Sequence, residues 1–105
     1  MNVNILPEQS VEREIRGILE ARREFLHGHR VILFGSRARG SADRLSDFDI
    51  GVDGAEPLDL QTFYEIEATL DQMPTLYRVD WVDLNRASAK LRENARREGR
   101  VLYEA

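Results

Sequence analysis

A glycine–serine turn and two closely spaced carboxylates stand in the central part of the sequence. Gly35 and Ser36 directly follow the apolar run 31–34, and Asp47 and Asp49 come after ten further residues. The first amides of a short helix that begins at Ser36 lack intrahelical partners, so they can bind an anion such as a triphosphate. Residues two apart on a strand share a face at roughly 6.6 Å spacing, so Asp47 and Asp49 are predicted to point the same way. The combination is typical of a phosphate-handling site that depends on divalent metal ions.

Two carboxylates on one partly dried surface repel each other. At a separation of a few Ångströms this repulsion amounts to on the order of a kcal/mol or more, depending on the local dielectric. Mg²⁺ relieves the repulsion, neutralises phosphate oxygens and aligns an attacking oxygen with a leaving one, with paired metals roughly 3.5–4 Å apart in two-metal sites. We therefore expect two Mg²⁺ ions at Asp47 and Asp49.

A third carboxylate usually completes such a site, and Asp80 is the best candidate. Strict alternation along residues 77–83 would bury Val79 and Trp81 on one face and turn Asp80 to the other. Asp83 falls on the opposite face from Asp80 and better suits a strand end or a helix cap. The interpretation requires Asp80 to face the other two aspartates. An Asp80 that faced away, or that was paired with an arginine, would contradict it.

These motifs together resemble the nucleotidyltransferase fold that is shared with DNA polymerase beta. Within that superfamily the chain most resembles the minimal nucleotidyltransferases, the MNT proteins encoded beside HEPN-domain partners, and the resemblance covers most of the chain. It implies an α/β (α+β) fold with a small mixed β-sheet of three to four strands flanked by helices. It also implies Mg²⁺-dependent transfer of a nucleoside monophosphate, usually AMP from ATP, to a hydroxyl with release of pyrophosphate.

The resemblance also implies a role for each residue of the motifs. Gly35 and Ser36 match the phosphate-binding turn, Asp47 and Asp49 match the metal ligands, and Asp80 matches the third carboxylate. In the family's toxin–antitoxin pairs the MNT protein modifies a tyrosine of a HEPN-domain ribonuclease and so silences it. We therefore expect a HEPN-type toxin, encoded by an adjacent gene, as the partner. Two alternatives are a small-molecule nucleotidyltransferase of the aminoglycoside type and a stoichiometric antitoxin that masks its partner without chemistry.

Two arginines follow the turn and have two interpretations each. Arg37 and Arg39 lie one and three residues beyond Ser36, so either guanidinium could contact the phosphates or the base of a nucleotide. Alternatively, one of them forms an ion pair that holds the turn, with Asp43 or Glu65 as the partner.

Composition agrees with a small enzyme core. A chain of 105 residues is expected to form one domain, residues 1–105. The net charge of −4 argues against direct binding of nucleic acid, which normally requires a basic face. The chain has no cysteine, no layout of an export signal and no apolar run of the ~20 residues that a membrane span needs. A cytoplasmic location is the expectation.

Hydrophobic periodicity outlines the elements that position these residues. A first helix is expected from about Pro7 or Ser10 to His27, with Phe25 on its apolar stripe. A second helix, capped by Asp59 and ended by Pro74, should turn Leu60 inward. The other expected elements are strands at 31–34, 47–52 and 77–83, a helix at 85–98, and a short edge strand or docked tail at 101–103.

Overall fold

A mixed four-stranded sheet forms the centre of the protein. The computed structural model describes residues 7–40 and 46–105. Within these ranges the elements are α1 (Glu8–Glu20), the 3₁₀ helix η1 (Arg23–Leu26), β1 (His29–Phe34), α2 (Ser36–Arg39), β2 (Phe48–Gly54), α3 (Leu60–Asp71), β3 (Val79–Asp83), α4 (Ala89–Glu98) and β4 (Arg100–Glu104). The strand order is β3-β2-β1-β4, in which only β2 and β3 run parallel. The predicted class of fold is confirmed.

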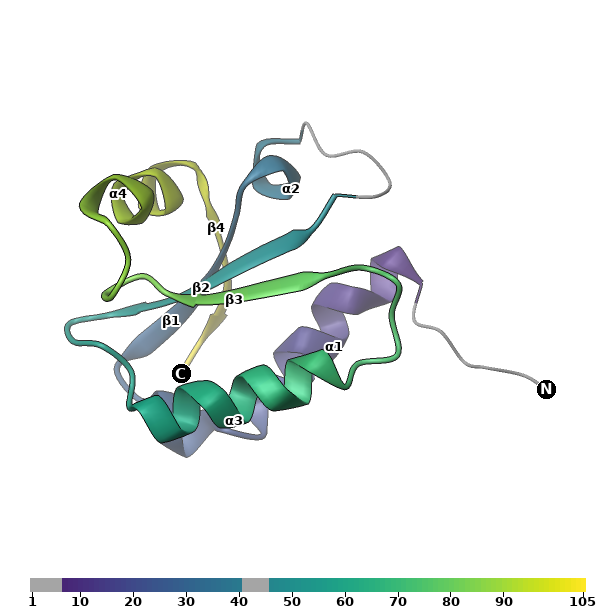
Figure 1. Ribbon diagram of the computed structural model, residues 1–105, viewed down its shortest axis with the longest axis horizontal. Coiled ribbons are helices and arrows are strands. Elements are labelled where there is room, and N and C mark those ends of the chain that lie inside the picture. The colour runs from purple at the N-terminus through teal and green to yellow at the C-terminus, as the bar shows by residue number, and fades with distance from the viewer. Residues whose placement is uncertain (1–6, 41–45) are drawn as a thin grey trace.

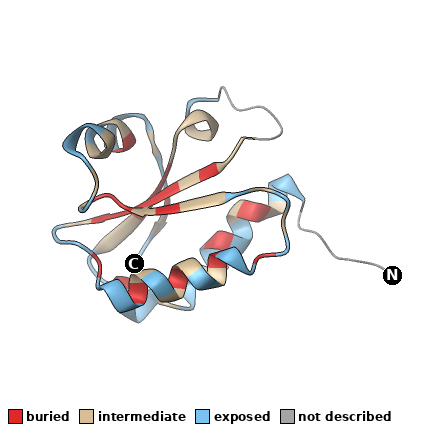
Figure 2. Ribbon diagram, viewed as in Figure 1, coloured by how far each residue is buried: buried red, intermediate tan, exposed pale blue. Residues whose placement is uncertain are grey.

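Helices cover both faces of the sheet, and each face has its own apolar cluster. Figure 1 shows α1 and α3 on one side of the sheet and α2 and α4 on the other. The larger cluster joins α1 and α3 to the strands and includes Ile15, Phe48 and Ile66. The smaller cluster joins α4 to the sheet through Ile32, Leu84 and Ala95. In Figure 2 the buried segments are concentrated along the strands and on the inner sides of the helices.

The central strand β2 separates these two environments by simple alternation. Phe48, Ile50 and Val52 point into the larger cluster, as expected for Phe48 and Ile50. Asp49, Gly51 and Asp53 therefore share the opposite face, the one covered by α2 and α4. A Cβ at Gly51 would lie 2.7 Å from Leu84 Cγ, so the absence of a side chain lets Leu84 pack directly on the strand. The carboxylates of Asp49 and Asp53 thus lie on either side of the contact between Gly51 and Leu84.

The first helix is shorter than predicted. It ends at Glu20 instead of His27, and the chain continues through a turn into η1. A 3₁₀ helix has about 3.0 residues per turn instead of 3.6, so the change of winding alters which side chain faces the core. Leu26 is buried as a result, whereas Phe25, which was predicted to lie inward, is 58% exposed. Arg22 at this turn is tied to α3 through an ion pair with Glu65.

The remaining elements differ from the prediction mainly at their ends. Asp59 caps α3 as expected, since its side chain accepts a hydrogen bond from the amide of Thr62 at 3.1 Å. Leu60, however, is exposed because it is the first residue of the helix and lies outside its inward stripe. Pro74 lies beyond the end of α3, which the structure places at Asp71.

The last helix begins four residues later than predicted. Its cap is Ser88, which accepts a hydrogen bond from the amide of Leu91 at 3.2 Å. Asn85 instead bonds through its carboxamide to both the amide and the carbonyl of Gly54, at 3.0 and 2.8 Å. These bonds hold the turn after β3 against the end of β2. The predicted C-terminal edge strand is confirmed as β4.

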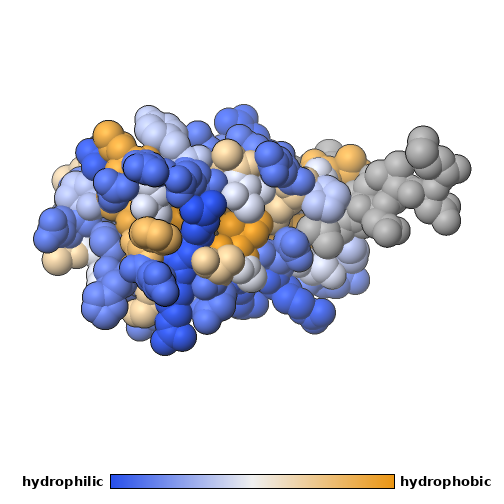
Figure 3. Space-filling model, turned by 90° about the horizontal axis from the view of Figure 1, so that it is seen from below, coloured by the Kyte–Doolittle hydropathy of each residue, from blue (hydrophilic) through white to orange (hydrophobic). Residues whose placement is uncertain are grey.

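Apolar side chains also reach the surface on the side of the molecule that carries α1 and α3. Figure 3 shows them there in patches between hydrophilic residues. Over the whole of the described surface, the large exposed hydrophobic residues are Phe25, Leu60, Tyr64, Leu76 and Val101. None of the helices within residues 7–40 and 46–105 combines the length and the apolar character that a membrane span requires.

Candidate active site

The turn between β1 and α2 requires glycine for two separate reasons. Gly35 has φ +74° and ψ −157°, a combination that side chains other than hydrogen rarely permit. A Cβ at this position would also lie 2.4 Å from Oδ2 of Asp49. The backbone of the turn therefore sits directly against the carboxylate, and only glycine allows that approach.

The turn leaves two amides available. The carbonyl of Gly35 accepts hydrogen bonds from the amides of Ala38 and Arg39, both at 3.1 Å, which start α2. The amides of Ser36 and Arg37 precede these bonds and have no backbone partner among the described residues. These are the two amides at the turn for which we predict a phosphate contact.

Asp49 and Asp80 lie side by side across the parallel strands β2 and β3. The parallel register pairs these two residues directly, so their side chains share one face of the sheet. Burial raises the pKa of Asp49 above its usual range, and the neighbouring charges of Asp80 and then of Asp47 raise it further, against a smaller opposing effect of Arg39. Two carboxylates so close together cannot both ionise freely without a cation, which is the electrostatic condition expected of a metal site.

Asp47 does not complete a three-carboxylate cage. In residues 7–40 and 46–105, no three His, Cys, Asp or Glu side chains gather closely enough to hold a metal ion. The ladder of β2 begins at Phe48, whose amide bonds to the carbonyl of Arg78, so Asp47 lies one residue before the strand. Strand alternation therefore does not orient its side chain, and the predicted convergence of all three carboxylates is not observed. Asp47 acts on Asp49 through its charge.

Asp80 faces Asp49 and is also paired with an arginine. Nε of Arg78 lies 2.9 Å from Oδ1 of Asp80, so one of the two observations that would contradict the prediction, pairing of Asp80 with an arginine, is present. The side chain of Arg78 is 74% exposed, however, and pairs of this kind contribute at most about 1 kcal/mol because water screens them. A cation or a substrate can displace such a partner. The contact with Asp49, by contrast, is imposed by the register of the sheet.

The two arginines after the turn differ in their surroundings. Arg37 is only 8% exposed: it pairs with Glu8 at 2.8 Å and donates to the carbonyl of Ser46 at 2.7 and 3.0 Å. Its guanidinium also lies 3.9 Å from the centre of the Phe48 ring. These contacts favour the structural alternative for Arg37, with Glu8 as the partner instead of Glu65. Asp43, the other proposed partner, lies outside the described residues.

Arg39 remains available for a ligand. It forms a half-exposed pair with Glu98 at 3.5 Å, and its charge acts on Asp49. Of the two arginines, Arg39 has the more exposed side chain and the longer ion pair.

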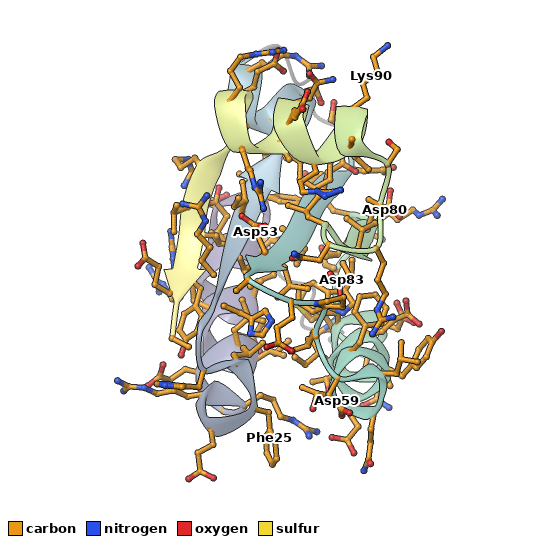
Figure 4. The ribbon with its side chains drawn as sticks, turned by 90° about the vertical axis from the view of Figure 1, so that its left-hand side faces the viewer. Phe25, Asp53, Asp59, Asp80, Asp83 and Lys90 are labelled. Carbon is orange, nitrogen blue, oxygen red and sulfur yellow. The ribbon has the colours of Figure 1, made fainter. Side chains whose placement is uncertain are left out.

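A residue that sequence analysis did not single out fixes the position of α4. Asp53 is almost fully buried, accepts hydrogen bonds from Arg96 at 2.7 and 3.1 Å, and pairs with Arg30 at 3.3 Å. The hydrogen bond from Arg96 is the largest of the effects that lower the pKa of Asp53. Figure 4 shows Asp53 beneath α4 and Asp80 toward the edge of the sheet that β3 forms. Its place four residues after Asp49 on one strand face is the only signal in the sequence.

Asp83 has the structural role that alternation indicated. It accepts hydrogen bonds from the amides of Leu58 and Asn85, at 2.8 and 2.9 Å, and so joins the end of β3 to the segment before α3. It is not a ligand candidate.

Comparison with known proteins identifies the family. Residues 14–105 match the family described as polymerase beta, nucleotidyltransferase. The chain belongs to this nucleotidyltransferase family. It is 32% identical over 74 residues to a Haemophilus influenzae protein named "Probable protein adenylyltransferase MntA". This match covers 70% of the chain and 65% of the relative, so the chain spans slightly less than two thirds of that relative's length.

Solved structures of similar nucleotidyltransferases come from toxin–antitoxin complexes. A chain of a toxin–antitoxin crystal structure with AMP-PNP is 31% identical, with a TM-score of 0.62, over 90% of this chain and 73% of that one. A chain of a complex between a tri-AMPylated HEPN toxin of Shewanella oneidensis and an MNT antitoxin is 27% identical, with a TM-score of 0.60, over 94% and 74% of the two chains. The predicted resemblance to the MNT proteins is confirmed.

The acidic residues of this nucleotidyltransferase fit a divalent cation. Carboxylate oxygens are the ligands that Mg²⁺ prefers, and Asp49 and Asp80 place theirs next to each other at the turn formed by Gly35 and Ser36. Burial first, and then the negative charge of Asp80, raise the pKa of Asp49, so its ionised form is disfavoured. A cation between the two carboxylates would stabilise that form.

Proposed function

We propose that the protein transfers AMP from ATP to a hydroxyl, expected to be that of a tyrosine, on a HEPN-type toxin encoded by an adjacent gene, and thereby acts as an antitoxin in the cytoplasm. The observation that carries this proposal is the direct pairing of Asp49 with Asp80 across β2 and β3, next to the Gly35 turn. Support also comes from the relatives, which are named as a protein adenylyltransferase and as partners in toxin–antitoxin complexes.

Each residue of the site has a distinct part in the proposed reaction. The amides of Ser36 and Arg37 bind the triphosphate, and Arg39 turns from Glu98 toward a phosphate oxygen. Asp80 accepts the proton of the acceptor hydroxyl, whose oxygen then forms a bond to the α-phosphorus. The bond between the α-phosphorus and the bridging oxygen breaks in line with this attack, and pyrophosphate carries away the electron pair.

Asp47, Asp49 and Asp80 would hold two Mg²⁺ ions in this proposal. When bound, Mg²⁺ neutralises phosphate charge and lowers the pKa of a coordinated hydroxyl. Asp49 is the central ligand because it lies between the turn and Asp80. Asp47 can approach it because the strand ladder does not constrain its side chain.

The same arrangement weighs against masking of the toxin without chemistry. A binding protein gains nothing from a carboxyl pair in which burial and then mutual repulsion raise the pKa of one member. Perturbed pairs of this kind are characteristic of catalytic and metal-binding sites.

Transfer of label separates the proposal from its alternatives. The protein is incubated with α-labelled ATP, Mg²⁺ and either the product of the neighbouring gene or a panel of aminoglycosides. We expect label on the neighbouring protein, none on the drugs, and none with Asp49→Asn. Glu93→Gln, which removes an exposed carboxylate on α4, should label the partner as the native protein does. Protection of cells by Asp49→Asn at normal expression would instead support stoichiometric masking.

A further inference from the structure

Among the residues that the structure describes, no strand adjoins the outer edge of β3. β3 is the last strand of the sheet, and Figure 1 shows it as the near strand with α3 below it. The carbonyl of Arg78 and the amide of Leu84 bond to β2, each at 2.9 Å. Because the peptide groups of successive residues alternate in direction, those of Val79 and Trp81 face away from β2. Neither has a backbone partner on that side among the described residues.

A cavity of about 310 Å³ adjoins this edge between β3 and the end of α3. Its floor includes Leu70, Met73 and Trp81, and its rim includes Asp80. This volume is at the lower end of the roughly 300–1,000 Å³ of small-molecule sites, so it suits a single side chain better than a whole nucleotide. The cavity opens on the side of β3 where Val79 and Trp81 point, whereas Asp80 is directed to the other face.

The charges around the cavity are mainly negative. Glu67 and Asp71 lie one helical turn apart on α3, and both line the cavity together with Asp80. Among the described residues of the lining, Arg78 is the one cation, and it already pairs with Asp80. Leu70, Met73 and Trp81 in the same lining offer apolar contacts. A complementary ligand therefore carries positive charge next to an apolar group.

We propose that the edge of β3 and this cavity bind an extended, basic segment of the acceptor protein as an additional strand. The inference rests on the proposed function, because it concerns the acceptor of the same reaction. Main-chain groups of the segment pair with the outward peptide groups of Val79 and Trp81. Free strand edges are ready templates for such pairing.

Alternation along the docked strand then determines where its side chains lie. A residue that pairs beside Asp80 presents its hydroxyl on the face where Asp80 meets Asp49. The residues directly before and after it point to the opposite face, and one of them enters the cavity between Glu67 and Asp71. The residue that accepts AMP is therefore selected through its neighbours in the sequence. These are expected to be Lys or Arg, which combine a positive charge with a long apolar stem.

Charge reversal tests this recognition. In Glu67→Arg/Asp71→Arg the two residues still repel each other, so the helix changes little while the cavity becomes basic. We expect the KM for the partner protein to rise about tenfold, with the melting-temperature shift caused by Mg²⁺ and ATP unchanged. The matched control is Glu14→Arg/Glu24→Arg, two exposed acidic residues away from the cavity. Equal KM values for the two double variants would overturn the proposal.

Hydrogen exchange tests the strand pairing directly. The native protein is combined with the partner and an ATP analogue that has a methylene group between its α- and β-phosphorus atoms, so that no transfer occurs. The amides of Val79 and Trp81 should exchange more slowly in the complex, while those of β4, the opposite edge strand, should not change. Unchanged exchange at Val79 and Trp81 would refute docking at this edge. Absence of AMP transfer by the native protein would contradict the proposed function alone, since the exchange result stands independently of it.

Discussion

Replacement of Gly35 by alanine should separate the geometry of the site from the stability of the fold. The backbone of Gly35, at φ +74° and ψ −157°, lies in a region that is almost restricted to glycine. A residue with a side chain held there costs on the order of 1–3 kcal/mol of folding free energy. For a domain of this size, each kcal/mol lowers the melting temperature by roughly 4–8 °C.

The effect on the reaction should be larger than the effect on stability. The new Cβ would lie 2.4 Å from Oδ2 of Asp49, and real Cβ contacts are essentially never closer than 3.0 Å, so the carboxylate must retreat by at least 0.6 Å. Misplacement of a reacting group by about 1 Å can reduce a rate by on the order of 10²-fold. We therefore expect Gly35→Ala to lose between one and two orders of magnitude in kcat for AMP transfer, measured below its melting temperature.

Gly28→Ala provides the matched control. Gly28 also has a positive φ, +81°, but a Cβ there would meet no atom within 4 Å. This variant should lose stability by a comparable backbone effect and keep its transfer rate. Wild-type kcat in Gly35→Ala, or an equal loss of kcat in Gly28→Ala, would refute the argument that contact between the turn and Asp49 sets the geometry of the site.

Three further predictions follow from the charges of the site. Asp53→Asn should lower the unfolding free energy at neutral pH by about 1–2 kcal/mol, since its arginine partners are partly exposed. Because the folded-state pKa of Asp53 is below 3.8, this stabilisation is complete above about pH 4 and is lost as the pH falls through the folded-state pKa, so denaturant titrations of the two proteins should converge in acid. Mg²⁺ with ATP should stabilise the native protein by about 2.7 kcal/mol at a hundred times the Kd, and Asp47→Asn far less; equal shifts in differential scanning fluorimetry would count against a metal ligand at that position. Arg37→Ala should lower the melting temperature with little change in the KM for ATP, whereas Arg39→Ala should raise that KM with little change in melting temperature. The opposite pattern would reverse the roles given to the two arginines.

The sequence predicted the features that depend on neighbouring residues and missed those that depend on residues far apart in the chain. The cap at Asp59 was predictable because it depends on neighbours within three residues. The end of the first helix was not, because its change of winding accompanies burial of Leu26 and contact between Arg22 and α3. Arg37 likewise had two open interpretations until the fold brought Glu8 to it. Contacts between distant segments leave no periodic signal in the chain.

The sequence by itself determined the chemistry that the site can hold. A glycine–serine turn, an alternating strand that carries Asp49, and a second alternating strand that carries Asp80 are local patterns, and local sterics and hydrophobic burial enforce them. Only the tertiary structure decided how these patterns meet. The parallel register of β2 and β3 brings Asp49 to Asp80 and excludes Asp47 from the ladder, and the ion pairs of Asp53 hold α4 over the same face. Register and ion pairing join residues that are far apart in the chain, so their outcome depends on how the whole core packs.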